Sequence, residues 1–93
     1  MTEPSDSLDR LIGRMVVLDT AGTIVFIGTL LEVKPDGFWL ETADLRDRTE
    51  GFVTKERYIC EAKAGGVQPN RRRLFVFRHV VISMSALDDV IAE

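Results

Sequence analysis

The chain has 93 residues and a formal net charge of −3, with 45% hydrophobic and 29% charged residues. These values predict one small globular domain with a single core rather than a disordered segment. The acidic balance excludes a uniformly basic nucleic-acid-binding surface, so any anion site must come from local clustering. Cys60 is the only cysteine, which excludes an intramolecular disulfide and a zinc cluster built from thiolates.

The N-terminal segment predicts a short helix over residues 5–13. Leu8, Leu11 and Ile12 recur at helical spacing, and Gly13 can end the helix in a left-handed conformation. The start of the sequence is acidic and lacks the apolar region of a signal peptide, and no apolar run reaches about 18 residues. We therefore expect a cytoplasmic protein that does not enter a membrane.

The next segments predict three antiparallel strands. Residues 15–19 and 23–33 are rich in β-branched side chains, and Gly28 within the second run indicates a sharp bend or a bulge. The Lys-Pro-Asp-Gly sequence at 34–37 is typical of a tight turn, and residues 38–43 predict the third strand. Together these elements form a meander.

A polar passage from residue 44 onward leads to a predicted helix over about 55–64. Thr54 can cap the start of this helix, while Gly65 and Gly66 can end it. The side chains expected to face the domain are Tyr58, Ile59 and Ala62.

Residues 71–83 begin with three consecutive arginines and continue as an apolar, β-favouring run that Arg78 and His79 interrupt. This pattern predicts two strands joined by a very short turn. Phe75 and Phe77 share one face of the first of these strands, and their period-two spacing is typical of core residues.

Two groups of residues carry a resemblance to a known family. The first group is Leu8, Leu11, Ile12, Gly13, Arg14, Val16, Val17, Asp19, Gly22, Gly28, Leu30 and Leu40. The second group is Phe77, Arg78, His79 and Ile82. In order and nearly in spacing they resemble the two motifs of the Sm-like (LSm) family, and the Arg-His pair looks closest to the Lys-His pair of the bacterial Sm-like RNA chaperone. The match covers about residues 5–43 and 73–87.

The resemblance implies a mainly β fold, a small SH3-like, strongly bent five-stranded antiparallel barrel with an N-terminal helix. Residues 1–93 would form a single Sm-like domain, in which the insertion 44–70 places the helix of about 55–64 between strands three and four. It also implies a homo-oligomeric ring without enzymatic activity, in which strand four of one copy pairs with strand five of the next. The interface residues expected from this pairing are Phe75, Phe77, Val81 and Met84.

RNA is the candidate ligand that the resemblance implies, and DNA is not expected. Arg78 and His79 would contact RNA at the turn, with Arg71 and Arg73 nearby. The turn at 34–37 departs from the family, because it is one residue shorter and lacks the Asn that helps to clamp a base. Half of the usual base-binding pocket is therefore missing, and the alternative is a structural or protein-interaction ring that has lost RNA binding.

The charged candidates also have structural interpretations. Arg71 and Arg73 share a strand face that Arg72 opposes, and they can bind phosphate or pair with acids of the insertion or of a neighbouring subunit. His79, the only histidine, can line a pocket or stabilise the turn. We expect Cys60 to be a packed side chain, and no pattern supports a catalytic dyad, a metal site or a cofactor.

Overall fold

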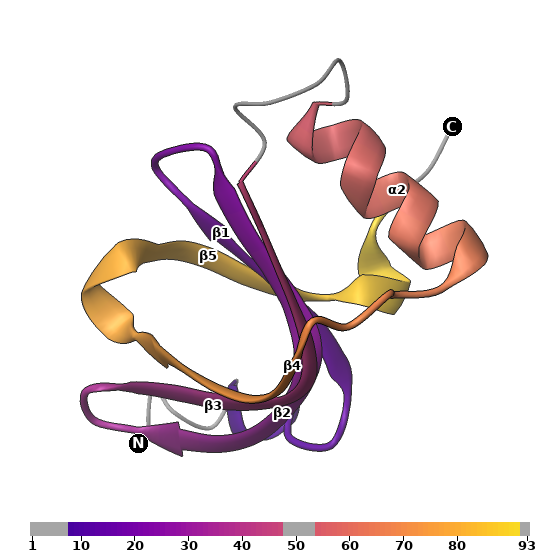
Figure 1. The fold of residues 1–93 in the computed structure, drawn as a ribbon. Coiled ribbons are helices and arrows are strands. Elements are labelled where there is room, and N and C mark those ends of the chain that lie inside the picture. Colours follow the sequence, from indigo (N-terminus) through magenta and orange to yellow (C-terminus); the bar gives the residue numbers. More distant parts are fainter. Residues whose placement is uncertain (1–7, 48–53, 92–93) are drawn as a thin grey trace.

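The structure of the protein is a computed structural model, and it describes residues 8–47 and 54–91 (Figure 1). Its strands form one sheet in the order β4-β3-β2-β1-β5, and every pairing is antiparallel. Neither described stretch contains a helix with the length and apolarity needed to cross a bilayer. In chain order the elements are β1 (Met15–Thr20), β2 (Ile24–Lys34), β3 (Gly37–Asp47), α2 (Lys55–Gly65), β4 (Arg71–Phe77), the 3₁₀ turn η1 (Arg78–Val80), β5 (Val81–Ala86) and the 3₁₀ turn η2 (Leu87–Asp89).

The expected N-terminal helix lies partly outside the described residues. Leu8 and Asp9 are helical, and the following turn ends at Gly13, whose φ of 88° is the left-handed conformation expected for it. The backbone N–H of Gly13 donates to the carbonyl of Leu30 over 2.7 Å, which attaches this turn to β2.

The bend at Gly28 is confirmed. The register between β2 and β3 shifts between Ile27 and Thr29 and again between Leu30 and Glu32. A Cβ at Gly28 would lie 2.9 Å from the Cβ of Ala43, so only glycine allows β3 to approach β2 this closely.

The third strand is longer than the sequence pattern predicted. β3 continues to Asp47 and pairs with residues 24–27 of β2, so the connection to α2 starts four residues later than the expected insertion at 44. The polar pattern was misleading because Asp44 is buried on the strand with its charge compensated by neighbouring side chains.

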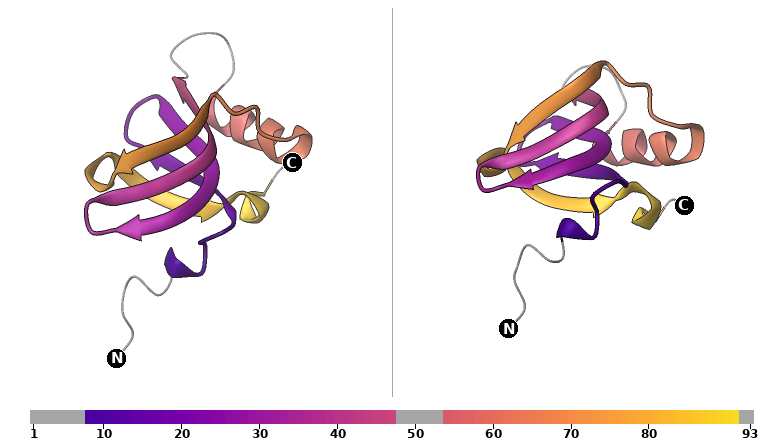
Figure 2. Two further views of the ribbon diagram at one scale, coloured as in Figure 1. Left: turned by 60° about the horizontal axis from the view of Figure 1, so that its bottom comes forward. Right: turned by 90° about the horizontal axis from the view of Figure 1, so that it is seen from below.

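Both faces of the curved sheet are packed. The inner cluster lies inside the curve and consists of Val16, Leu18, Phe26, Leu30, Phe38, Leu40, Ala43 and Val76. The outer cluster lies under α2 and consists of Val17, Val25, Ile27, Ile59, Ala62 and Leu87. Because successive strand residues point to opposite faces, β1 and β2 supply both clusters, and α2 lies outside the curved sheet (Figure 2).

Helix α2 agrees with its prediction. The hydroxyl of Thr54 accepts a hydrogen bond from the N–H of Arg57, and Gly66 ends the helix with a φ of 94°. Ile59 and Ala62, which were expected to face the domain, are 5% and 6% exposed. The helix is therefore positioned both by its local caps and by burial of one apolar face.

The expected bent five-stranded sheet is confirmed, but hydrogen bonds do not close it into a barrel. β4 and β5 stand at the two ends of the strand order, and only η1 connects them. Among the described residues, each of these strands pairs along one side only. Two backbone edges thus remain open for another chain.

Candidate interaction surface

The outward-facing side chains of β4 form the most conspicuous surface of the domain. Leu74 and Val76 pack against the inner cluster, so the alternate residues point away from it. We call this alternate set the β4 outer row, and it consists of Arg71, Arg73, Phe75 and Phe77. One end of the row is cationic and the other is aromatic.

The aromatic end of the β4 outer row is extended by aromatic side chains of β3 and η1. The ring centroids of Trp39 and Phe75 are 5.0 Å apart, those of Phe75 and Phe77 are 5.1 Å apart, and those of Phe77 and His79 are 6.0 Å apart. Together they make a continuous ladder of rings over β3, β4 and η1, of the kind on which unpaired bases can stack.

Phe75 and Phe77 are therefore not core residues, and that interpretation of their spacing was wrong. Phe77 is 54% exposed and Phe75 is half-buried, whereas Val76 between them is 2% exposed. The inner cluster already takes the smaller aliphatic face of β4, and α2 covers β1 and β2 instead of the outer face of β4. Alternation alone revealed two faces without telling which one is buried.

Arg78 joins the β4–β5 turn to the β2–β3 turn. Its backbone N–H donates to the carbonyl of Asp36 over 2.9 Å. Its guanidinium donates to the carbonyls of Pro35 over 3.1 Å and Lys34 over 2.8 Å, and its Cζ lies 4.8 Å from the centre of the Phe38 ring. The side chain remains exposed, so its unused N–H groups face solvent beside the turn.

His79 lies at the rim of an apolar hollow. The side chain is exposed, and the hollow of about 520 Å³ is also lined by Val80, Ile82 and the turn between β1 and β2. The two expected interface residues of β5, Val81 and Met84, are half-buried against the inner cluster. Ile82, at 64% exposure, is the more accessible apolar side chain of that strand.

The sequence suggested that Arg71 and Arg73 lie near Arg78, but the structure places them apart. They stand at the opposite end of β4, about 20 Å away along the strand at roughly 3.3 Å per residue. Asn70 fixes this end, because its side chain exchanges hydrogen bonds of 3.1 and 3.0 Å with the backbone of Leu45 on β3. The cationic and turn candidates are thus two separate sites.

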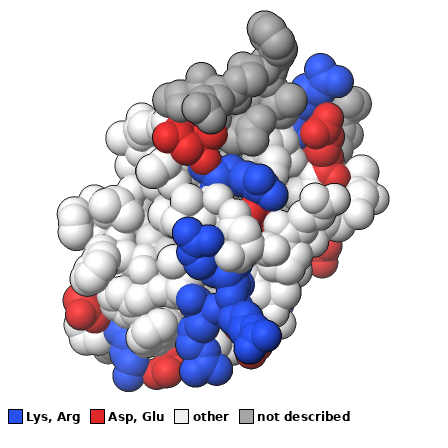
Figure 3. Space-filling view, in the orientation of Figure 1, with Lys and Arg blue, Asp and Glu red and all other residues white. Residues whose placement is uncertain are grey.

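The expected ion pairs between the arginines and the insertion are not formed within the described residues. Arg71, Arg72 and Arg73 are exposed, and none makes an ion pair with a described side chain. Asp44 is bound to other partners, and Glu50 lies outside the described residues. Figure 3 shows Lys and Arg side chains gathered over the lower part of the face that carries β3 and β4.

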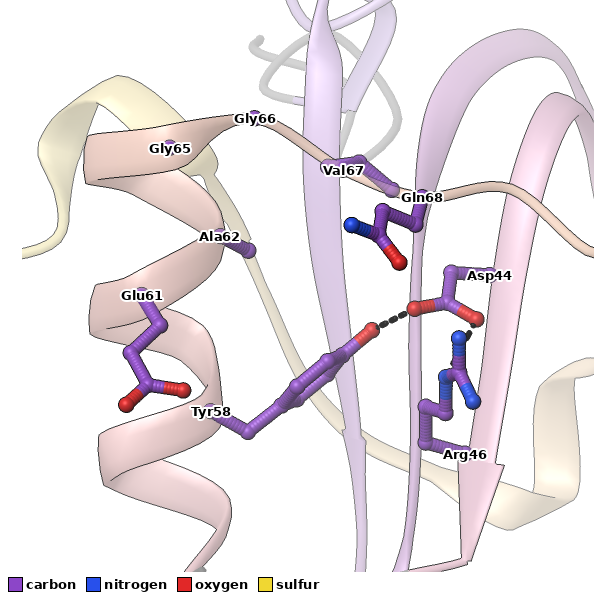
Figure 4. A pocket seen from close by; sticks show the side chains of 9 residues that line it. All are labelled: Asp44, Arg46, Tyr58, Glu61, Ala62, Gly65, Gly66, Val67 and Gln68. Atoms are coloured by element: carbon purple, nitrogen blue, oxygen red, sulfur yellow. Dashed lines mark hydrogen bonds and ion pairs between the residues drawn. The ribbon is translucent and has the colours of Figure 1, made fainter.

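A second candidate is the buried charge cluster between β3 and α2 (Figure 4). Asp44 is 1% exposed; the hydroxyl of Tyr58 donates to its Oδ2, and Nε of Arg46 lies 2.8 Å from its Oδ1. Two causes raise the pKa of Tyr58 above its ordinary value: burial is the larger, and the hydrogen bond to Asp44 is the next. Tyr58 therefore stays a neutral donor near neutral pH, and the cluster fastens α2 to β3.

The charge cluster also lines a hollow of about 340 Å³ at the C-terminal end of α2. Tyr58 was expected to face the domain, but the sequence pattern did not single out Asp44 or Arg46. The usable signal was the alternation of Ala43 and Leu45 with Asp44 and Arg46, which continues the period of the preceding strand.

The comparisons with known proteins concern the fold. No protein-family model matches the chain, and no curated protein is significantly similar to it. The Sm protein of Pyrococcus abyssii, solved in complex with a uridine heptamer, superposes with a TM-score of 0.63 at 15% identity, covering 91% of this chain and 99% of that one. The chain therefore has a divergent Sm-like fold.

Chains of the NatC complex are also similar. In the complex bound to Gag peptide and CoA, the match has a TM-score of 0.53 at 14% identity and covers 83% of this chain and 86% of that one. In the complex bound to CoA, the TM-score is 0.55 at 14% identity, with coverages of 85% and 82%. The same fold thus occurs in an RNA complex and in a chain of a protein complex.

Proposed function

We propose that this protein is a non-enzymatic Sm-like module that assembles into a homo-oligomeric ring and contacts single-stranded RNA. The observation that carries the proposal is the pair of open strand edges, β4 and β5, at the two ends of an Sm-like sheet. Each edge offers unpaired backbone N–H and C=O groups, which favour strand addition by another copy.

Exposed apolar side chains support assembly at these edges. Val80 and Ile82 are 38% and 64% exposed, and both lie at the passage from η1 to β5. A long apolar edge strand that stayed uncovered would promote uncontrolled aggregation. Pairing β4 of one copy with β5 of the next covers both edges at once and closes into a ring.

The ladder of rings supports RNA contact. Strand pairing uses the backbone edge in the plane of the sheet, whereas Trp39, Phe75 and Phe77 project from its outer face. Their rings therefore stay available for base stacking after assembly. Arg78 and His79 at the adjoining turn supply a cation and a further ring, and the uridine heptamer bound to the Pyrococcus protein is consistent with such a ligand.

A protein-interaction ring without RNA binding is the second candidate. The short turn at 34–37, which lacks an Asn, and the net charge of −3 favour this candidate. The occurrence of the fold in a chain of the NatC complex also favours it.

Solution mass and RNA titration together test both candidates. We expect a mass that is a multiple of the 10.5 kDa chain, and binding of short U-rich or A-rich RNA that weakens as salt rises. Phe77→Ala should weaken RNA binding about 5- to 150-fold, which corresponds to roughly 1–3 kcal/mol for one lost stacking contact. Ile12→Ala, at a residue that is 43% exposed and lies away from the ladder of rings, is the matched control.

The outcomes separate the proposals. A monomer at micromolar concentration contradicts the ring. An assembly that binds no RNA even at low salt contradicts RNA binding and supports the protein-interaction ring instead.

A further inference from the structure

An acidic groove runs along the outer side of the open β5 edge. It has a volume of about 370 Å³, and its polar lining consists of Asp19, Glu56, Ser83, Ser85 and Asp89. Ser83 and Ser85 belong to β5, Glu56 to the first turn of α2, and Asp89 to η2. The groove therefore borders the edge where another strand would add.

Two carboxylates of this groove have no cationic partner in the part of the chain that the structure describes. Asp19 is paired with Lys55, whose Nζ lies 2.6 Å from its Oδ1. Glu56 and Asp89 are exposed, and neither makes an ion pair with a described residue. Unpaired acids at one open edge thus correspond to the unpaired arginines at the other.

Resting on the ring proposed above, we propose that Arg71 and Arg73 of one copy bind Glu56 and Asp89 of the next copy. Every strand pair within the sheet is antiparallel, and an antiparallel β4–β5 pair places the Arg end of β4 beside the C-terminal end of β5. Asp89 follows directly there in η2. A parallel pair would instead place the Arg end beside the cations of η1, Arg78 and His79.

The faces of the two strands also agree. Cross-strand neighbours point to the same side of a sheet, so the β4 outer row of one copy lies on the outer side of β5 in the next. Ser83 and Ser85 point to this side, because their β1 partners are Asp19 and Val17, and Val17 packs in the outer cluster. This is also the side that α2 covers, so the inserted helix supplies Glu56 as part of the docking surface.

Charge reversal tests the contact. One variant carries Arg71→Glu and Arg73→Glu, and the other carries Glu56→Lys and Asp89→Lys. Each variant alone should raise the dissociation constant of the assembly by about tenfold or more, because two attractive contacts become repulsive. A one-to-one mixture should restore assembly, since an alternating ring pairs opposite charges at every contact.

The controls carry the same changes of charge elsewhere. Arg10→Glu with Arg57→Glu, and Glu32→Lys with Glu61→Lys, alter exposed residues outside the groove and outside β4. We expect these controls to keep the mass of the unaltered protein, and higher salt to weaken assembly of the unaltered protein.

Failure of this inference differs from failure of the ring. A monomeric unaltered protein contradicts both. If the unaltered protein assembles and the charge reversals leave its mass unchanged, or if the mixture does not reassemble, only the proposed contact is contradicted. Loss of RNA binding by the Arg71→Glu/Arg73→Glu variant with its mass unchanged would assign these arginines to RNA instead.

Discussion

Replacing Tyr58 by phenylalanine tests how the inserted helix is held on the domain. The substitution removes one hydroxyl and leaves the ring in place. That hydroxyl donates to Oδ2 of Asp44, a carboxylate that is 1% exposed. Without it, this oxygen of a buried carboxylate loses its donor, while Arg46 still faces the other oxygen.

The expected loss follows from that burial. Leaving one buried polar atom without its partner costs about 1–3 kcal/mol, which is a large part of the roughly 5–10 kcal/mol that stabilises a domain of this size. We expect α2 to detach more readily, because its remaining contacts to the sheet are the packing of Ile59 and Ala62 and the ion pair between Lys55 and Asp19.

Urea unfolding followed by the fluorescence of Trp39, the only tryptophan, measures the change in free energy of unfolding. Hydrogen exchange of the α2 amides tests whether the loss is local. The control is Arg57→Ala, which removes an exposed pair with Glu61 and should cost less than about 0.5 kcal/mol.

A double-mutant cycle isolates the interaction. Asp44→Asn and Tyr58→Phe should each destabilise the protein, and together they should lose less than the sum. A loss below about 0.5 kcal/mol for Tyr58→Phe, or a coupling energy near zero, would refute the role given to this charge cluster.

Two further predictions follow from the same packing. Because burial and Asp44 raise the pKa of Tyr58, the folded state holds the phenol proton more tightly than the unfolded state does. The contribution of the protonated hydroxyl to the free energy of unfolding should therefore be complete below about pH 10 and decline above it. Absorbance of the only tyrosine reports this, and ionisation at the ordinary tyrosine pKa would contradict it. Gly28→Ala, with a Cβ placed 2.9 Å from a β3 side chain, should cost about 1–3 kcal/mol in urea unfolding, whereas Gly22→Ala, with no atom within 4 Å, should cost under about 0.5 kcal/mol. Equal effects of the two would show that the bend tolerates a side chain.

Much of the local structure was predictable from the sequence because it depends on neighbouring residues. Thr54 caps α2 and Gly66 ends it. The ends of any helix leave backbone groups unpaired, and a side-chain acceptor at the start and a glycine at the end allow these groups to be hydrogen-bonded. Gly28 predicted the bend in β2, and the Arg78-His79 pair predicted the short turn between β4 and β5. Together with the two groups of residues that resemble the Sm-like motifs, these features predicted the Sm-like fold, which is confirmed.

Only the tertiary structure decided which faces and which charges are buried. Period-two spacing placed Phe75 opposite Val76, but the inside of β4 was determined by the curvature of the whole sheet and by the position of α2 over β1 and β2. The sequence pattern placed Asp44 in a loop, but it is buried on β3, where Tyr58 and Arg46 compensate its charge. Spacing along a chain is local, whereas burial depends on contacts between segments far apart in sequence, and for this reason the sequence predicted the strands but not the surface that they present.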